Sequence, residues 1–268
     1  MYAGSLSGVY KAAYESGIPV RFVHQDHIGE LLESGIRCLY LPMALVLSGR
    51  ETEVFEEFVR RGGTLVSEAC PGLYKTDGLL DQKSAALRRL FDVNHREIQG
   101  IRDFGPVNAV WEEDDSTITG SFYRQLITPG ESARVAARFE DGEPAVAVRD
   151  LGTGRAVWIG TYPSCQYERD GGGDPGTRAF LTRFMEPGGY ELIERIQISE
   201  AERGIVSRAP VVRLLETESG WAVMAVNHLP RPAWVDIHFK ARDLEDIHLE
   251  LKPEDGACRR MDRRREGL

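Results

Sequence analysis

The segment over residues 35–72 constrains the fold of this chain more than any other part of it. It holds a short apolar run ending at Leu41-Pro42, then an amphipathic stretch, the glycine pair Gly62-Gly63, and a second apolar run over residues 64–70. Short apolar runs bounded by chain-breaking residues are typical of buried parallel strands, and the stretch between them predicts a helix. This order is a β-α-β unit, the building block of an open parallel sheet.

The predicted helix carries signals at both of its ends. Ser48 and Glu51 form an S-x-x-E capping box, which satisfies amide groups at a helix start. Gly62 suits the left-handed conformation that commonly ends a helix. The apolar face has helical spacing and consists of Val54, Phe55, Phe58 and Val59.

Composition places the chain among soluble globular proteins of one large or two smaller domains. It has 268 residues, of which 42% are hydrophobic and 28% charged. No apolar run approaches the ~20 residues that cross a bilayer, and the N-terminus lacks the pattern of a signal peptide. We therefore expect a cytoplasmic protein with no membrane partner. The net charge of -9 argues against a nucleic-acid partner, and the Arg-rich residues 258–268 are interpreted as a solvated tail.

The remaining pattern predicts two domains with a boundary at residues 189–190. The first is α/β, an open parallel sheet with flanking helices, and the second is a small all-β sandwich. Helices are expected over residues 5–16, 26–33, 79–91 and 177–185. Strands are expected over residues 18–23, 109–111, 118–127, 133–139, 145–148 and 155–161, and then over 211–217, 221–227, 233–239 and 247–251.

Several segments resemble one family in the same order. Residues 8–23, GVYKAAYESGIPVRFV, resemble the opening of the trimerisation domain of family 42 β-galactosidases, and residues 39–66 and 152–161 are similar to later strands of that domain. Residues 221–228, WAVMAVNH, resemble a strand of the β-sandwich that closes those enzymes. The resemblance implies a fold similar to flavodoxin and to class I glutamine amidotransferases. It also implies a role in assembly, as a homotrimer or beside a catalytic barrel, with no cofactor.

The catalytic part of such enzymes is not recognisable in this sequence. A (β/α)8 barrel takes about 250 residues, and retaining hydrolysis needs two carboxylates about 5 Å apart. In that family the catalytic acid follows an asparagine, but Asn94, Asn108 and Asn227 are followed by His, Ala and His. The chain therefore resembles a non-catalytic rear portion, in which a neighbouring subunit would help to wall the active-site pocket.

Cys70 supplies an alternative, enzymatic hypothesis. In the similar amidotransferases a cysteine in a tight turn after a strand is the nucleophile, so Cys70 is a weak candidate for a divergent hydrolase. Against this, Pro71 removes the amide that would follow the nucleophile in an oxyanion hole. The region that would supply the histidine partner, residues 160–165, contains none.

The other candidate groups favour structural roles. The four cysteines form no C-x-x-C pair, and the loose spacing of His24, Asp26 and His27 favours a solvated loop, so no metal site is expected. His228 is interpreted as fixing a turn, His95 has no evident partner, and residues 170–176 read as a surface loop rather than an anion site.

Exposed tryptophans leave a third hypothesis open, a carbohydrate-binding module. Trp158 and Trp221 lie within apolar strands and are expected in the core. Trp111 and Trp234 are candidates for a sugar or subunit contact. Two or more coplanar exposed aromatic rings would favour this third hypothesis.

Overall fold

The computed structural model describes residues 2–16, 18, 20–80, 85–171, 174–185, 193–200, 211–217, 220–227, 230–239 and 245–262. The chain divides into two compact units. The first comprises Met1–Ala12 and Arg21–Met185, and the second comprises Ala13–Val20 and Glu186–Leu268. The boundary predicted at residues 189–190 lies outside the described residues and stays a prediction.

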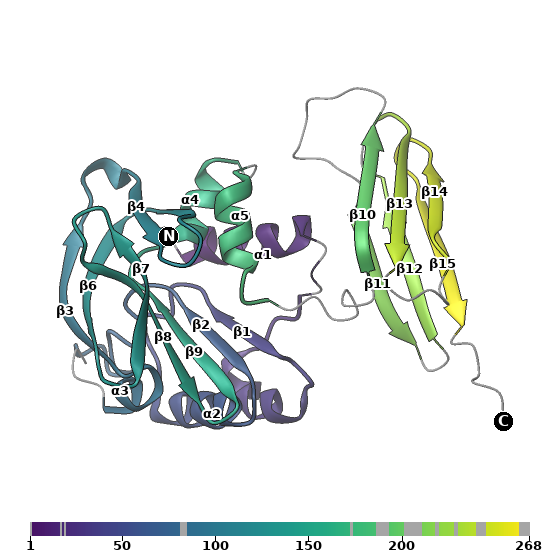
Figure 1. The fold of residues 1–268 in the computed structure, drawn as a ribbon. Coiled ribbons are helices and arrows are strands. Elements are labelled where there is room, and N and C mark those ends of the chain that lie inside the picture. Colours follow the sequence, from purple (N-terminus) through teal and green to yellow (C-terminus); the bar gives the residue numbers. More distant parts are fainter. Residues whose placement is uncertain are drawn as a thin grey trace. The chain divides into compact units, whose positions relative to one another are not determined.

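Helices and strands alternate in the first part of the chain up to residue 100, a run of strands follows over residues 107–159, and two helices end this part before Met185 (Figure 1). In order they are α1 (Tyr2–Glu15), η1 (Gln25–Glu33), β1 (Cys38–Leu41), α2 (Gly49–Arg60), β2 (Thr64–Ser67), α3 (Ala85–Phe91), β3 (Val93–Gly100), η2 (Arg102–Phe104), β4 (Val107–Trp111), β5 (Thr117–Gly120), β6 (Tyr123–Pro129), β7 (Ala133–Phe139), β8 (Pro144–Leu151), β9 (Gly154–Ile159), α4 (Pro163–Arg169) and α5 (Pro175–Thr182).

A seven-stranded sheet with the order β1-β2-β9-β8-β7-β4-β5 forms the centre of this unit. Strands β1, β2 and β9 are parallel, with Leu39 opposite Leu65 and Leu65 opposite Ala156. The other four strands pair antiparallel, because short turns join β7 to β8 and β8 to β9. The prediction of an α/β sheet with flanking helices is confirmed, and its parallel part is limited to three strands.

The β-α-β unit forms as its local signals predict. The Ser48 side chain accepts from the Glu51 amide at 3.2 Å, and the Glu51 carboxylate accepts from the Ser48 amide at 2.7 Å. The two amides are therefore satisfied by the reciprocal capping box, and α2 begins at Gly49.

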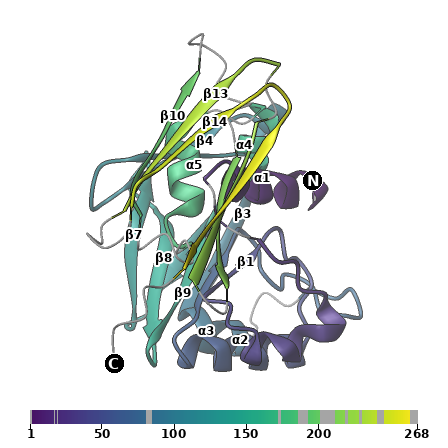
Figure 2. The ribbon, with the colours of Figure 1, turned by 90° about the vertical axis from the view of Figure 1, so that its right-hand side faces the viewer.

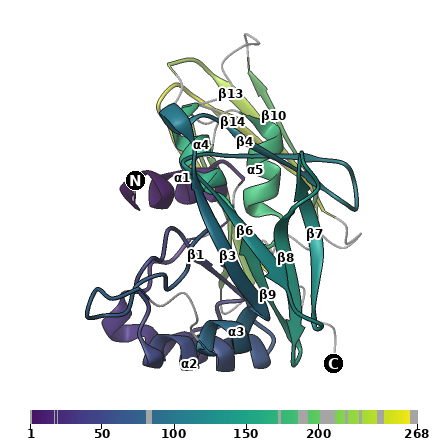
Figure 3. The ribbon, with the colours of Figure 1, turned by 90° about the vertical axis from the view of Figure 1, so that its left-hand side faces the viewer.

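Helices cover both faces of the parallel strands. Figures 2 and 3 show α2 and α3 side by side along one face, where Phe55, Phe58 and Phe91 pack on Leu65 and Trp158. The neighbouring residues along each strand point to the opposite face, since strand side chains alternate. There Val66, Val157 and Ile159 share a core with Phe180 of α5.

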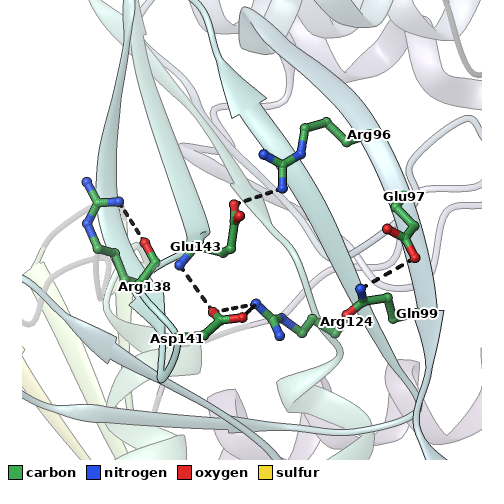
Figure 4. Close-up of polar contacts among 8 residues, drawn as sticks. Arg96, Glu97, Gln99, Arg124, Arg138, Asp141 and Glu143 are labelled. Carbon is green, nitrogen blue, oxygen red and sulfur yellow. Dashed lines mark hydrogen bonds and ion pairs between the residues drawn. The ribbon is translucent and has the colours of Figure 1, made fainter.

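A separate two-stranded ribbon, β3–β6, was not predicted. The 118–127 segment is two strands rather than one, since the chain turns at Phe122, which has a φ of 69°. Salt bridges tie the ribbon to the β7–β8 turn (Figure 4): Arg96 lies 2.8 Å from Glu143, and Arg124 lies 2.5 Å from Asp141. The polar surface of β3 gave no clear alternation, which explains why the sequence pattern missed it.

Three further expectations need correction. The described residues of 18–23 form no strand, and the helix predicted over residues 79–91 begins at Ala85, with Leu80 in a β-bridge to Tyr74. Helix α4 was missed. It begins at Pro163, whose fixed φ suits the first turn of a helix, but this short segment has too few residues to show helical periodicity.

From Ile193 onward the described chain is all-β, as predicted. Its strands are β10 (Ile193–Glu200), β11 (Val211–Thr217), β12 (Gly220–Val226), β13 (Ala233–Phe239), β14 (Ile247–Leu251) and β15 (Gly256–Asp262). They form two antiparallel sheets, β10-β13-β14 and β11-β12-β15. Val212 and Val223 of one sheet share an apolar core with Val235 and Leu249 of the other, which makes a sandwich.

The Arg-rich end is partly structured, which corrects the expectation of a solvated tail. Strand β15 pairs with β12, with Arg259 opposite Val223 and Arg260 opposite Ala222. The backbone hydrogen bonds of a sheet hold these residues irrespective of their charge.

Candidate functional site

Among the described residues, a connected group of buried polar side chains lies at the carboxyl ends of β1, β2 and β9. Glu68 follows β2 and is fully buried. Its Oε2 accepts from the hydroxyls of Ser5 at 2.5 Å and Ser164 at 2.7 Å. Its Oε1 accepts from the backbone amide of Ser164 at 2.9 Å and from the Tyr40 hydroxyl at 3.3 Å. In open α/β sheets, this edge is where ligand sites usually form.

Helices α1 and α4 close this edge. Ser5 lies on α1 and Ser164 in the first turn of α4, and their hydroxyl oxygens are 2.7 Å apart. A Cβ atom at Gly8 would lie 2.0 Å from the Ser164 carbonyl oxygen, so only glycine allows this approach of α1. The result is a packed polar cluster, in which the protein's own hydroxyls hydrogen-bond the carboxyl group.

Burial dominates the electrostatics of the cluster. It raises the pKa of Glu68, and the hydroxyl and amide donors oppose that shift in part. The pKa of Tyr40 is raised well above its ordinary value, first by burial and then by the neighbouring Glu68. All these groups lose hydration, so their neutral forms are favoured.

Cys70 occupies a left-handed backbone position, with a φ of 62°, two residues after Glu68. Its amide donates to Gln125 Oε1 at 2.7 Å, and the Trp158 indole donates to the same oxygen at 3.0 Å. Burial raises the pKa of the Cys70 thiol to about 12. A nucleophilic cysteine needs the opposite shift, because the thiolate is the reactive form. The tight turn therefore resembles a nucleophile position in backbone shape but not in thiol chemistry.

The histidines of the first unit, His24, His27 and His95, form no hydrogen bond to Glu68, and His95 is linked to the Cys70 turn through Gln125. His95 Nδ1 is 3.2 Å from Gln125 Nε2, and burial lowers the pKa of His95. His24 Nδ1 accepts from the Asp26 amide at 3.3 Å and caps η1, while His27 lies 3.0 Å from Glu30. In the part of the chain that the structure describes, no group of three or more metal-ligating side chains occurs. His228 lies outside the described residues.

The loop before α5 has a capping role. Thr177 donates its amide to Asp174 Oδ2 at 2.7 Å, so Asp174 is the N-cap of α5. The Asp174 pKa is lowered, first by the side chain of Thr177 and then, more weakly, by this backbone amide. The acidic loop residue thus satisfies the helix start itself.

Trp111 is a core residue, which corrects its selection as an exposed contact. It is 3% exposed, with Phe180 and Phe184 at centroid distances of 5.9 and 5.8 Å. The Arg183 guanidinium lies 4.4 Å from its ring centroid. These neighbours cover the indole ring, so it offers no exposed face on which a sugar could stack. Trp158 is buried, as expected for the core.

Trp234 is half-buried on the outer face of the β13–β14 pair. It lies opposite Glu250, and the next pair on that face joins Asp236 to His248. The described residues of β13 and β14 place no second tryptophan, tyrosine or phenylalanine on this face. Trp221, in the other sheet, is partly buried against the core of the sandwich.

Sequence reasoning missed the centre of the cluster, Glu68 with Ser5 and Ser164. A glutamate directly after an apolar strand was the only signal. Its serine partners lie 63 and 96 residues away along the chain, beyond any local pattern.

Comparison with known families decides the classification. The family model described as the β-galactosidase trimerisation domain matches residues 2–185. The chain belongs to this family. The match begins within α1 and ends after α5, so it includes the seven-stranded sheet, the β3–β6 ribbon and the Glu68 cluster. The resemblance seen in the sequence is confirmed.

Solved structures extend the likeness in fold to the second unit. Gan42B, a family 42 β-galactosidase from G. stearothermophilus, is 20% identical with a TM-score of 0.73, over 98% of this chain and 36% of that one. The β-galactosidase from Bacillus circulans sp. alkalophilus is 17% identical with a TM-score of 0.70, over 96% and 37%. That of Halorubrum lacusprofundi is 15% identical with a TM-score of 0.68, over 97% and 36%.

The chain thus spans about 36% of the length of these enzymes. At this level of identity the likeness concerns the fold. Among the described residues, no helix is long and apolar enough to cross a membrane.

Proposed function

We propose that this chain serves as the assembly portion of a β-galactosidase-like glycoside hydrolase, associating with copies of itself around a three-fold axis. The observation that carries the proposal is the trimerisation-domain match over residues 2–185. A closed ring of three gives each copy the same two contacts, and is the arrangement that the family description names.

The chemistry of the Glu68 cluster supports an assembly role over a hydrolase. Its oxygens are engaged by Ser5, Ser164 and Tyr40, and the pKa of the nearby Cys70 thiol is raised to about 12. A thiol with that pKa is almost wholly protonated at neutral pH, so it lacks the nucleophilic form. We therefore do not propose the amidotransferase-like alternative.

An exposed apolar surface supports self-association. Val46, Leu79 and Leu80 are 51%, 63% and 59% exposed. Tyr74 joins them, since it forms β-bridges to both Val46 and Leu80. We call these four residues the apolar loop patch. Contiguous exposed apolar groups are a common mark of protein interfaces. Carbohydrate binding has weaker support, because Trp234 has no second large aromatic ring beside it on the described strands β13 and β14.

The mass of the purified chain in solution tests this proposal. Light scattering on a sizing column should give three times the monomer mass of 30.0 kDa. A charge at the centre of an apolar interface is costly, so Leu80→Glu should shift the mass toward the monomer. Val110→Glu is the control, since Val110 is 38% exposed on β4, outside the apolar loop patch. A monomer at every concentration would contradict the proposal.

A further inference from the structure

Three oxygen atoms in the Glu68 cluster form a closed triangle. Glu68 Oε2 lies 2.5 Å from Ser5 Oγ and 2.7 Å from Ser164 Oγ, and the two Oγ atoms are themselves 2.7 Å apart. Each separation is that of an O–H···O hydrogen bond. Each such bond needs one hydrogen, so the triangle needs three.

The two serine hydroxyls supply only two hydrogens. If both donate to an ionised Glu68, the contact between Ser5 and Ser164 holds two oxygens at 2.7 Å with no hydrogen between them. We propose that Glu68 supplies the third hydrogen as a neutral carboxylic acid, and that this proton clamps helix α1 onto the carboxyl end of the sheet. The carboxyl then donates to Ser5, which reverses the direction that this contact has when Glu68 is ionised, while Ser5 donates to Ser164 and Ser164 donates back to Glu68.

The second carboxyl oxygen fits this assignment. Oε1 accepts from the Ser164 amide and the Tyr40 hydroxyl, which suits the carbonyl oxygen of a protonated carboxyl with its two lone pairs. Each of the three oxygens of the triangle then donates once and accepts once within it, in a consistent direction. Hydrogen bonds arranged in one direction strengthen each other in a medium of low dielectric.

Three acidic side chains interact with Glu68. Tyr40 lies on β1, Tyr162 lies in the loop after β9, and Cys165 lies on α4. Burial is the largest cause that raises the pKa of each of them, and Glu68 raises each pKa further. The groups that shift the pKa of Glu68 are burial and the neutral donors Ser164, Ser5 and Tyr40. The largest of these influences is burial, and the named donors that oppose it are neutral. The amino terminus of the chain lowers the pKa of the neighbouring Cys165.

The consequence is a pH-dependent clamp. Because burial raises the folded-state pKa of Glu68 above its ordinary value of about 4.3, the clamp is complete below that value. It is lost as the pH rises through the folded-state pKa, when the proton leaves to water. Ionisation would place an uncompensated charge between α1 and the sheet, and α1 would loosen. This inference does not rest on the proposed assembly function.

Infrared spectroscopy of the full chain tests the protonation directly. At about pH 6 an ordinary glutamate is almost fully ionised, so a carboxylic acid C=O band should come from Glu68. The band should be absent in Glu68→Gln and retained in Glu53→Gln, a matched change at an exposed position of α2. A wild-type spectrum with no such band at that pH would overturn the proposal.

Hydrogen exchange tests the clamp itself and needs no variant to fold. The protection factors of amides 8–12 in α1, corrected for intrinsic exchange, should fall by up to about tenfold per pH unit between the ordinary glutamate pKa of about 4.3 and the pH at which the band disappears, and should level off above that pH, because opening releases a proton only while the closed state is protonated. In Glu68→Gln they should not change with pH. Protection of α1 that is equally independent of pH in the wild type while the band disappears would overturn the clamp.

Discussion

Glu68 at the carboxyl end of the parallel strands is buried among hydroxyl groups, whereas Asp141 in the β7–β8 turn is exposed and faces an arginine. Asp141 lies 2.5 Å from Arg124, and its pKa is lowered, first by that contact. The pKa of Glu68 is raised, first by burial. Within one unit, the pKa of a carboxyl group is thus raised at Glu68 and lowered at Asp141.

The difference teaches what each cluster is suited to do. Around the β3–β6 ribbon, ion pairs such as Arg96–Glu143 stay hydrated and hold two surface elements together with little cost of desolvation (Figure 4). In the Glu68 cluster, solvent is excluded, so each contact depends on correct hydrogen bonding. Changes in the buried cluster should therefore cost more than changes in the exposed one.

The largest effect on stability is expected from adding a Cβ atom where α1 lies against α4. Gly8→Ala places a Cβ against the backbone carbonyl of Ser164, which cannot move aside as a flexible side chain can. We expect a loss of about 3 kcal/mol in the free energy of unfolding, the upper range for overpacking. Denaturant unfolding measures it.

Gly4→Ala in the same helix is the matched control for that change. Nothing lies within 4 Å of a Cβ at Gly4, so the better helix propensity of alanine should stabilise the protein slightly. Equal effects of the two substitutions would show that α1 does not dock closely on α4.

A smaller effect is expected from removing one serine hydroxyl. Ser164→Ala deletes a donor to the buried Glu68 and should cost about 1–3 kcal/mol. Ser132→Ala deletes an equivalent contact, 2.7 Å from Asp92, at an exposed position. Water can replace that hydroxyl, so Ser132→Ala should lower the free energy of unfolding by less than about 1 kcal/mol. Denaturant unfolding measures both variants. A larger loss in the free energy of unfolding for Ser132→Ala than for Ser164→Ala would contradict the expected difference between the exposed and the buried site.

The smallest effect is expected at the exposed ion pair, with a pH dependence of opposite sign to that of Glu68. A double-mutant cycle of Arg124→Leu and Asp141→Asn should give a coupling below about 1 kcal/mol near neutral pH, as for surface pairs. Because the Asp141 pKa is lowered, this stabilisation is present above the ordinary value of about 3.9 and lost as the pH falls through the folded-state pKa.

Denaturant unfolding of the four proteins at about pH 7 and about pH 2 measures this coupling. Leucine keeps an apolar contact with Phe139, whose ring lies 4.5 Å from the Arg124 guanidinium, so the cycle isolates the charge. A coupling that is unchanged at low pH would mean that the ion pair contributes nothing.

The sequence by itself determined the elements whose signals are local. The capping box of Ser48 and Glu51 and the stop at Gly62-Gly63 define α2 between two buried strands. Alternation of apolar and polar residues likewise identifies β13 and β14. In each case the interacting groups are a few residues apart, so the pattern that specifies the element is visible in one short window.

Tertiary structure alone decided which strands pair antiparallel, where the β3–β6 ribbon lies and how the Glu68 cluster forms. Ser5 and Ser164 meet although 159 residues separate them, and Trp111 is buried because Phe180, Arg183 and Phe184, about 70 residues later in the chain, pack against its ring. No periodicity encodes such contacts. They follow from packing the helices on the sheet, and the resulting loss of water sets the protonation of Glu68.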